Sequence, residues 1–137
     1  MDFDASTGAL SLAVDFGLND VVGWEFSGSG QYLYLFMGEF GTSIYQVELN
    51  DVDESDPMAG ASLINQPSGV VYFYPQRAPD GNIYIENAFG GDIARIVAPN
   101  LPAGQAEFEP VFTNFQALIN SFGNYFHRYV HGESLFV

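Results

Sequence analysis

The feature that most constrains this chain is an internal repeat of about fifty residues. Residues 23–35 and 74–85 each contain a strand-like run, a short polar turn ending in glycine, one polar residue, and a run of aliphatic and tyrosine residues. A second match follows between residues 41–47 and 90–96. A repeat of this length predicts structural units that stack on one another, because one such unit cannot bury its own apolar surface.

Both matches keep the same register. Tyr34 and Tyr84 stand 50 positions apart, and Ile44 and Ile93 stand 49 positions apart, so the offset is constant to within one residue. Two motifs that share one offset indicate repeated units far more strongly than either motif alone.

The glycine-rich segments predict tight turns between antiparallel strands. Ser-Gly-Ser-Gly at 27–30 and Pro-Asp-Gly at 79–81 are hairpin turns, because glycine accepts the positive φ that reverses a strand. After each turn, aliphatic residues alternate with Tyr34 or Tyr84, which is the period of a strand. Each unit is therefore predicted to be an antiparallel meander of three or four strands, packed face to face with its neighbour.

The composition agrees with this all-β prediction. Hydrophobic residues make up 47% and aromatic residues 16% of the chain, and 15 Gly and 7 Pro supply the turns. We expect one domain over residues 1–137, with units at approximately 11–50 and 61–100 and partial units at 1–10 and 107–137.

Three shorter segments fit the same pattern of repeated units. Residues 3–11 indicate the end of an outer strand, a turn and the next inner strand, and residues 109–115 resemble the inner strand of a third unit. Residues 50–58 are acidic and are predicted to connect the two units.

The net charge of the chain argues against nucleic acid as a partner. The chain has 17 acidic residues, three arginines and no lysine, and its formal charge of −14 repels the phosphate backbones of nucleic acids and anionic lipid surfaces. Apolar stretches are far too short for a bilayer-spanning helix, so no membrane insertion is expected. With no cysteine, disulfides and thiolate sites are ruled out.

A family resemblance sharpens the fold prediction. It is carried by the residues around the Thr7-Gly8 turn, by segments 23–34 and 44–47, and by segments 78–85 and 96–100. Their order resembles the WD40/YVTN-like β-propeller of large secreted surface proteins from Bacteroidota, the gliding-motility-associated and PKD-containing group. The resemblance covers residues 3 to about 126 and implies a propeller-like stack of four-stranded antiparallel blades, two of them complete.

The resemblance also implies a role and a compartment. Such propellers are non-catalytic binding or display modules of exported proteins, so we expect no enzyme activity and an extracellular or bacterial cell-surface location. The acidic start of the chain is unlike a secretory signal, which places any export signal outside this sequence.

A closed propeller needs four to eight blades. We therefore expect the chain to be an excerpt of a longer protein, or to assemble with further copies or with a protein partner.

One acidic loop is a candidate metal site. Four carboxylates lie within residues 51–56, and calcium is bound by such oxygen clusters, with Asp51, Asp53 and Asp56 as ligands. The loop is not an EF-hand, because its sixth position is Asp56 and its twelfth is Ser62. We interpret it as a solvated acidic loop and expect no cofactor; a calcium-stabilised adhesin module is the alternative.

A carbohydrate-binding or carbohydrate-active propeller is a further alternative. Its sugar-stacking platform would consist of Trp24, Tyr32, Tyr34, Tyr72 and Tyr74, although aromatics at alternating strand positions more often pack between sheets.

Other motifs favour structural readings. His127 and His131 are predicted to lie on a strand and turn rather than on a zinc-binding helix. Ser29 lies in a hairpin turn without the Gly-x-Ser-x-Gly pattern of a hydrolase, and the three arginines are predicted to form ion pairs.

Overall fold

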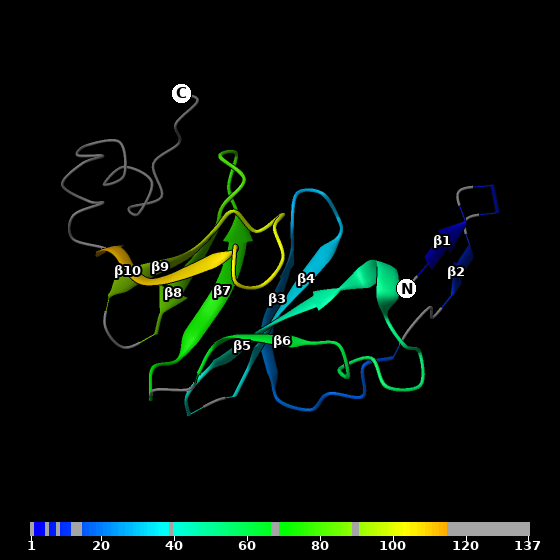
Figure 1. Cartoon of the computed structure of the whole chain (residues 1–137), viewed down its shortest axis with the longest axis horizontal. Coiled ribbons are helices and arrows are strands. Elements are labelled where there is room, and N and C mark those ends of the chain that lie inside the picture. Colours follow the sequence, from blue (N-terminus) through cyan, green and yellow to red (C-terminus); the bar gives the residue numbers. More distant parts are fainter. Residues whose placement is uncertain are drawn as a thin grey trace, which may run out of the picture.

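The described part of the chain is built from β-strands (Figure 1). The computed structural model describes residues 2–4, 6–7, 9–11, 15–38, 40–66, 69–88 and 91–114. Within these residues there are ten strands and one short 3-10 helix, η1, and no α-helix: β1 Asp2–Asp4, β2 Ala9–Ser11, β3 Val21–Phe26, β4 Tyr32–Met37, β5 Ser43–Glu48, η1 Leu49–Asp51, β6 Ser62–Asn65, β7 Tyr72–Arg77, β8 Ile83–Asn87, β9 Asp92–Val97 and β10 Glu107–Asn114. No helix among the described residues is long and apolar enough to cross a bilayer.

Two four-stranded antiparallel meanders form the body of the molecule. The first sheet has the order β3-β4-β5-β6 and the second the order β7-β8-β9-β10, while β1 and β2 form a separate hairpin. The prediction of an all-β fold with repeated antiparallel units is confirmed. In each sheet the strands follow one another along the chain, so each strand after the first pairs with the strand that precedes it.

The two glycine-rich hairpin turns have the same construction. In the first, the Ser27 amide donates to the Tyr32 carbonyl over 2.9 Å and Gly30 has a φ of 73°. In the second, the Ala78 amide donates to the Asn82 carbonyl over 2.9 Å and Gly81 has a φ of 87°. Both turns lie between the first and second strands of their sheets, as the repeat predicts.

The fourth strand of each sheet differs from the sequence-based assignment. β6 pairs with β5, so the acidic segment at residues 50–58 connects two strands of the first sheet and does not connect two units. β10 pairs with β9 as the outermost strand of the second sheet, so it is not the inner strand of a third unit. Both strands have weak patterns: β6 has only four residues, and β10 contains Pro110 beside a register shift between Glu109 and Thr113. A proline is tolerated there because β10 is an edge strand.

The two sheets pack face to face around one apolar core. β3 lies against β7, the first strand of one sheet beside the first strand of the other (Figure 1). The fourth strands, β6 and β10, also approach each other. The buried side chains of this core come from both sheets: Tyr32, Tyr34, Phe36, Ile44, Tyr72, Ile83, Ile85, Ala94, Ile96 and Ala106.

Strand alternation defines two faces on each sheet. We call the face that carries Tyr34 in the first sheet, and Tyr84 in the second, the forward face. The opposite face, with Leu33 and Leu35 in the first sheet and Ile83 and Ile85 in the second, is the rear face. The forward face of the first sheet packs on the rear face of the second. The rear face of the first sheet is covered by side chains such as Phe16, Leu18, Val52 and Met58.

Candidate functional site

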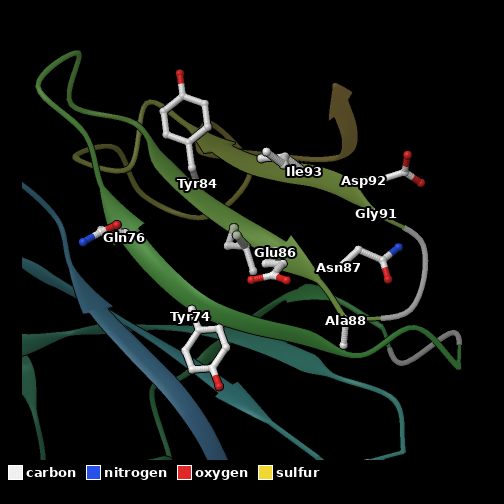
Figure 2. A pocket seen from close by; sticks show the side chains of 10 residues that line it. Tyr74, Gln76, Tyr84, Glu86, Asn87, Ala88, Gly91, Asp92 and Ile93 are labelled. Atoms are coloured by element: carbon white, nitrogen blue, oxygen red, sulfur yellow. The ribbon is translucent and has the colours of Figure 1, made fainter. Parts of the chain in front are cut away.

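The forward face of the second sheet carries a cavity. Its volume is about 510 Å³, and it opens over the β8–β9 end of the sheet. Figure 2 shows side chains of three strands around it, Tyr74 and Gln76 from β7, Glu86 and Asn87 from β8, and Ile93 from β9. Tyr84, Ile85, Ala88, Gly91 and Asp92 complete the lining. The cavity therefore combines aromatic and apolar surface with amide and carboxylate groups.

The alternation of β8 creates this surface. Ile83 and Ile85 are fully buried against the first sheet, so Tyr84 and Glu86 must lie on the opposite side. The Tyr84 hydroxyl donates to the Asp80 Oδ2 atom over 2.5 Å. This hydrogen bond, followed by one from the Asn82 amide, lowers the pKa of the Asp80 carboxyl below its usual value.

An arginine and an aromatic ring extend the same face toward β10. The Arg95 Nε atom donates to the Glu109 Oε2 atom over 2.6 Å, and its guanidinium carbon lies 4.0 Å from the Phe112 ring centroid. The Phe112 ring also meets the Tyr84 ring edge-on at 5.6 Å. The predicted ion pairing is confirmed for Arg95. Phe112 is 43% exposed, so this aromatic surface faces solvent.

A bulge in β7 places Tyr74 at the surface. The register of β7 against β8 shifts between Phe73 and Gln76, and Tyr74 has a φ of 53°, a left-handed conformation. For a residue with a Cβ atom this conformation costs about 1–2 kcal/mol. Tyr74 is 75% exposed and lines the cavity. The bulge therefore directs an aromatic side chain outward that a regular strand would place differently.

The structure separates the five aromatics of the predicted sugar platform. Tyr32, Tyr34 and Tyr72 are buried in the core between the sheets, so they cannot form a platform. Trp24 is exposed but pairs with Leu35, which places it on the rear face of the first sheet. Only Tyr74 of the five lines the cavity. For the three buried tyrosines the packing interpretation is confirmed and the platform alternative is excluded, because strand alternation places their side chains between the sheets.

A buried polar network joins the two sheets. The Tyr34 hydroxyl donates to the Pro99 carbonyl over 2.9 Å, and the Gln46 Nε2 atom donates to the Tyr34 hydroxyl (2.7 Å) and to the Leu101 carbonyl (2.8 Å). The Gln46 Oε1 atom accepts from the Ala103 amide over 2.8 Å. Burial raises the pKa of Tyr34 to about 12, although the hydrogen bond from Gln46 opposes the shift. Two side chains of the first sheet thus position the β9–β10 connection of the second.

Arg77 makes a second junction between the sheets. Its Nη1 atom donates to the Ser27 carbonyl over 2.9 Å and to the Phe26 carbonyl over 3.2 Å. Its backbone amide donates to the Glu25 Oε2 atom over 3.1 Å. The contacts of the Arg77 guanidinium are thus with main-chain carbonyls of the preceding hairpin. The sequence alone did not indicate these contacts, since the partners lie about fifty positions away.

In the acidic loop, the Asp53 carboxylate is hydrogen-bonded within the loop itself. The Asp53 Oδ1 atom accepts from the Ser55 hydroxyl over 2.6 Å and from the Ser55 amide over 2.9 Å, which lowers the pKa of Asp53. Asp56 is exposed, and its amide donates to the Asp53 carbonyl. Asp51 lies in η1, and its side chain is outside the described structure. Among the described residues no group of three or more histidine, cysteine or acidic side chains is arranged to bind a metal. The calcium site stays a prediction.

The two remaining motifs have different outcomes. His127 and His131 lie outside the described residues. Ser29 is in the first hairpin turn, where its hydroxyl contacts the Ser27 hydroxyl at 3.0 Å and its amide donates to the Asn100 Oδ1 atom at 2.9 Å. These contacts give Ser29 a structural role in the turn.

Comparisons with protein-family models, with curated proteins and with solved structures give no match to this chain.

Proposed function

We propose that this chain is a non-catalytic interaction or structural module, built from propeller-type blades, of an extracellular bacterial protein. The observation that carries the proposal is the way in which the two sheets stack. Each sheet is a complete four-stranded meander, and the forward face of one packs on the rear face of the next. This is the arrangement by which successive propeller blades cover one another.

The open forward face of the second sheet supports an interaction role. It is the counterpart of the face on the first sheet that packs in the core, yet it leaves Tyr74 exposed at the cavity and Phe112 exposed beside Tyr84. Exposed aromatic surface of this kind marks a contact region. Its partner would be another blade of the same polypeptide, a further copy of the chain, or another protein.

The acidic charge suits the proposed location. A charge of −14 without any lysine keeps a stack of aromatic-rich sheets soluble by mutual repulsion. Together with the resemblance to secreted propellers, it supports an extracellular or cell-surface setting, in which the loops at the sheet ends face solvent or a partner.

Two charge-reversal variants test the interaction role. Because the proposal requires a partner on the open face, from the same chain or from a further copy, we expect Glu86→Lys on that face to lower the free energy of unfolding, measured by urea denaturation, by more than Glu54→Lys, which makes the same charge change on the exposed acidic loop. Light scattering then identifies the partner: a mass above 15.0 kDa that falls on dilution indicates a further copy, and a monomer indicates a segment of the same chain. Equal effects of the two substitutions would contradict the proposal.

Carbohydrate binding is the second candidate, and the cavity favours it. Tyr74 offers an exposed ring, and Gln76, Glu86 and Asn87 offer hydrogen-bonding groups around it, the combination that sugars require. A glycan array should give signals that Tyr74→Ala removes and that Phe40→Ala, which truncates a 92% exposed ring elsewhere, does not. Silence across a broad array would exclude this candidate.

A further inference from the structure

A third turn glycine continues the repeat beyond the second sheet. Gly30 and Gly81, which close the two equivalent hairpin turns with positive φ, are 51 positions apart. Gly132 follows Gly81 at the same spacing of 51 positions. Three glycines in constant register indicate three copies of one turn.

The residues after this glycine repeat those of the first unit. Gly30 is followed by Gln-Tyr-Leu-Tyr-Leu at 31–35, and Gly132 is followed by Glu-Ser-Leu-Phe-Val at 133–137. Leu135 and Val137 therefore take the positions of Leu33 and Leu35, which lie on the rear face of the first sheet. The corresponding pair in the second sheet is Ile83 and Ile85, which packs on the forward face of the first.

The arginine before the glycine in the second unit has a counterpart at the same spacing. Arg77 stands four positions before Gly81, and Arg128 stands four positions before Gly132. In the second sheet, Arg77 donates to the Ser27 carbonyl of the preceding hairpin. The position that corresponds to Ser27 in the second unit is Ala78, again 51 residues on.

From this register we propose that residues 123–137 are the first hairpin of a third repeat unit and cover the open forward face of the second sheet. The inference rests on the proposed propeller-type stacking and names the occupant of that face. Leu135 and Val137 pack on the surface around Tyr84 and Glu86, and the Arg128 guanidinium donates to the Ala78 carbonyl.

Charge favours this occupant over a second copy of the chain. All acidic residues except Glu133 and all arginines except Arg128 precede residue 115, so residues 115–137 carry no formal net charge, while the rest carries the whole −14. A second copy would bring another strongly acidic surface to a face that already contains Glu86 and Asp92. The neutral segment approaches that face without such repulsion.

Thiol protection tests the proposal on the full chain. The protein has no cysteine, so Glu86→Cys introduces a single thiol on the forward face of the second sheet. We expect it to react with a thiol reagent at least about tenfold more slowly than Ala59→Cys, which lies in an exposed turn, because a covered group reacts only through local opening. Leu135→Asp should abolish the protection, and Ser134→Asp, the same change on the opposite strand face, should preserve it.

Several results would overturn the proposal. The first is that the thiols of Glu86→Cys and Ala59→Cys react at equal rates. The second is that Leu135→Asp and Ser134→Asp have equal effects on the protection. The third is that the protection vanishes on dilution, which would show that a second copy covers the face. If Glu86→Cys does not fold, Ile93→Cys reports on the same face. Loss of protection together with self-association would reject the third hairpin but leave the interaction role intact, so the two proposals fail separately.

Discussion

Gln46 shows how a single side chain can join two repeat units. Its strand belongs to the first sheet, yet its side chain hydrogen-bonds to the Leu101 carbonyl and the Ala103 amide in the β9–β10 connection of the second sheet, and to the Tyr34 hydroxyl. Its burial could be predicted from the alternation of β5. Its partners could not, because Leu101 and Ala103 lie more than fifty residues away and in an irregular segment without any sequence pattern.

Replacing Gln46 tests this junction. Gln46→Leu removes the part-buried hydrogen bonds to the Leu101 carbonyl and the Ala103 amide. Each such hydrogen bond contributes about 0.5–1.5 kcal/mol, so we expect a loss of about 1–3 kcal/mol in the free energy of unfolding, measured by urea denaturation. Gln31→Leu is the matched control, because the Gln31 side chain, just before β4, donates to the Glu48 carboxylate within the first sheet and, among the described residues, to no group of the second. Equal losses in the two variants would refute the junction.

Tyr34 predicts a specific alkaline transition. Its pKa is raised to about 12 by burial, above the usual value of 10.0, so the folded state retains a proton that the unfolded state has lost between these values. Stability from Tyr34 is therefore complete below pH 10 and falls as the pH rises toward 12, by an amount on the order of 2 kcal/mol. Unfolding monitored at pH 9 to 12 should show this slope, and Tyr34→Phe should flatten it. An unchanged slope in Tyr34→Phe would assign the transition to other groups.

At the scale of strands and turns, regular elements were predictable and irregular ones were not. The two glycine turns and the strands β4 and β8 follow from alternation and from positive φ at Gly30 and Gly81. The fourth strands, β6 and β10, could not be placed in their sheets from the sequence. β6 has only four residues, and β10 is bulged and contains a proline, so neither strand has a clear alternation of apolar and polar residues. The bulge at Tyr74, where the register of β7 against β8 shifts, is also absent from the pattern.

The closest approach of the two sheets predicts the effect of one methyl group. A Cβ atom on Gly23 of β3 would lie 2.7 Å from the Pro75 Cδ atom of β7, closer than real Cβ contacts, so the strands must separate. We expect Gly23→Ala to lower the free energy of unfolding by about 1–3 kcal/mol. Gly60→Ala, where nothing lies within 4 Å, should be neutral or slightly stabilising. Thermal denaturation compares the two, and a neutral Gly23→Ala would show that β3 and β7 are not in close contact.

For the whole molecule, the repeat predicted the number of complete units and their antiparallel strands, while the cavity and the exposed aromatic face appeared only in three dimensions. The outer face of β8 is aromatic only if Tyr84 faces outward and Ile85 inward, and the sequence alone allows either orientation. The sugar-platform alternative is excluded for Tyr32 and Tyr34 for the same reason. Both are residues of a type found in binding surfaces, but their side chains lie in the core between the sheets.

The net charge predicts how stability depends on salt. With 17 acidic residues and three arginines, self-repulsion opposes the compact state, and sodium chloride screens it. Screening worth about 1 kcal/mol should raise the melting temperature by about 3 °C between low salt and 0.5 M sodium chloride. If the acidic loop binds calcium, calcium should raise the melting temperature more than magnesium does at equal ionic strength. Asp53→Asn should remove this additional rise while retaining the turn. A melting temperature that falls with sodium chloride would contradict the electrostatic argument.

The central claim is that the two meanders are successive copies stacked forward face to rear face. Nuclear Overhauser contacts in a sample with labelled aromatic rings and isoleucine methyls measure it directly. We predict contacts from the rings of Tyr34 and Phe36 to the methyls of Ile83 and Ile85, across the core that these residues share. Isoleucine methyls that show no contact with either ring would contradict the stacking.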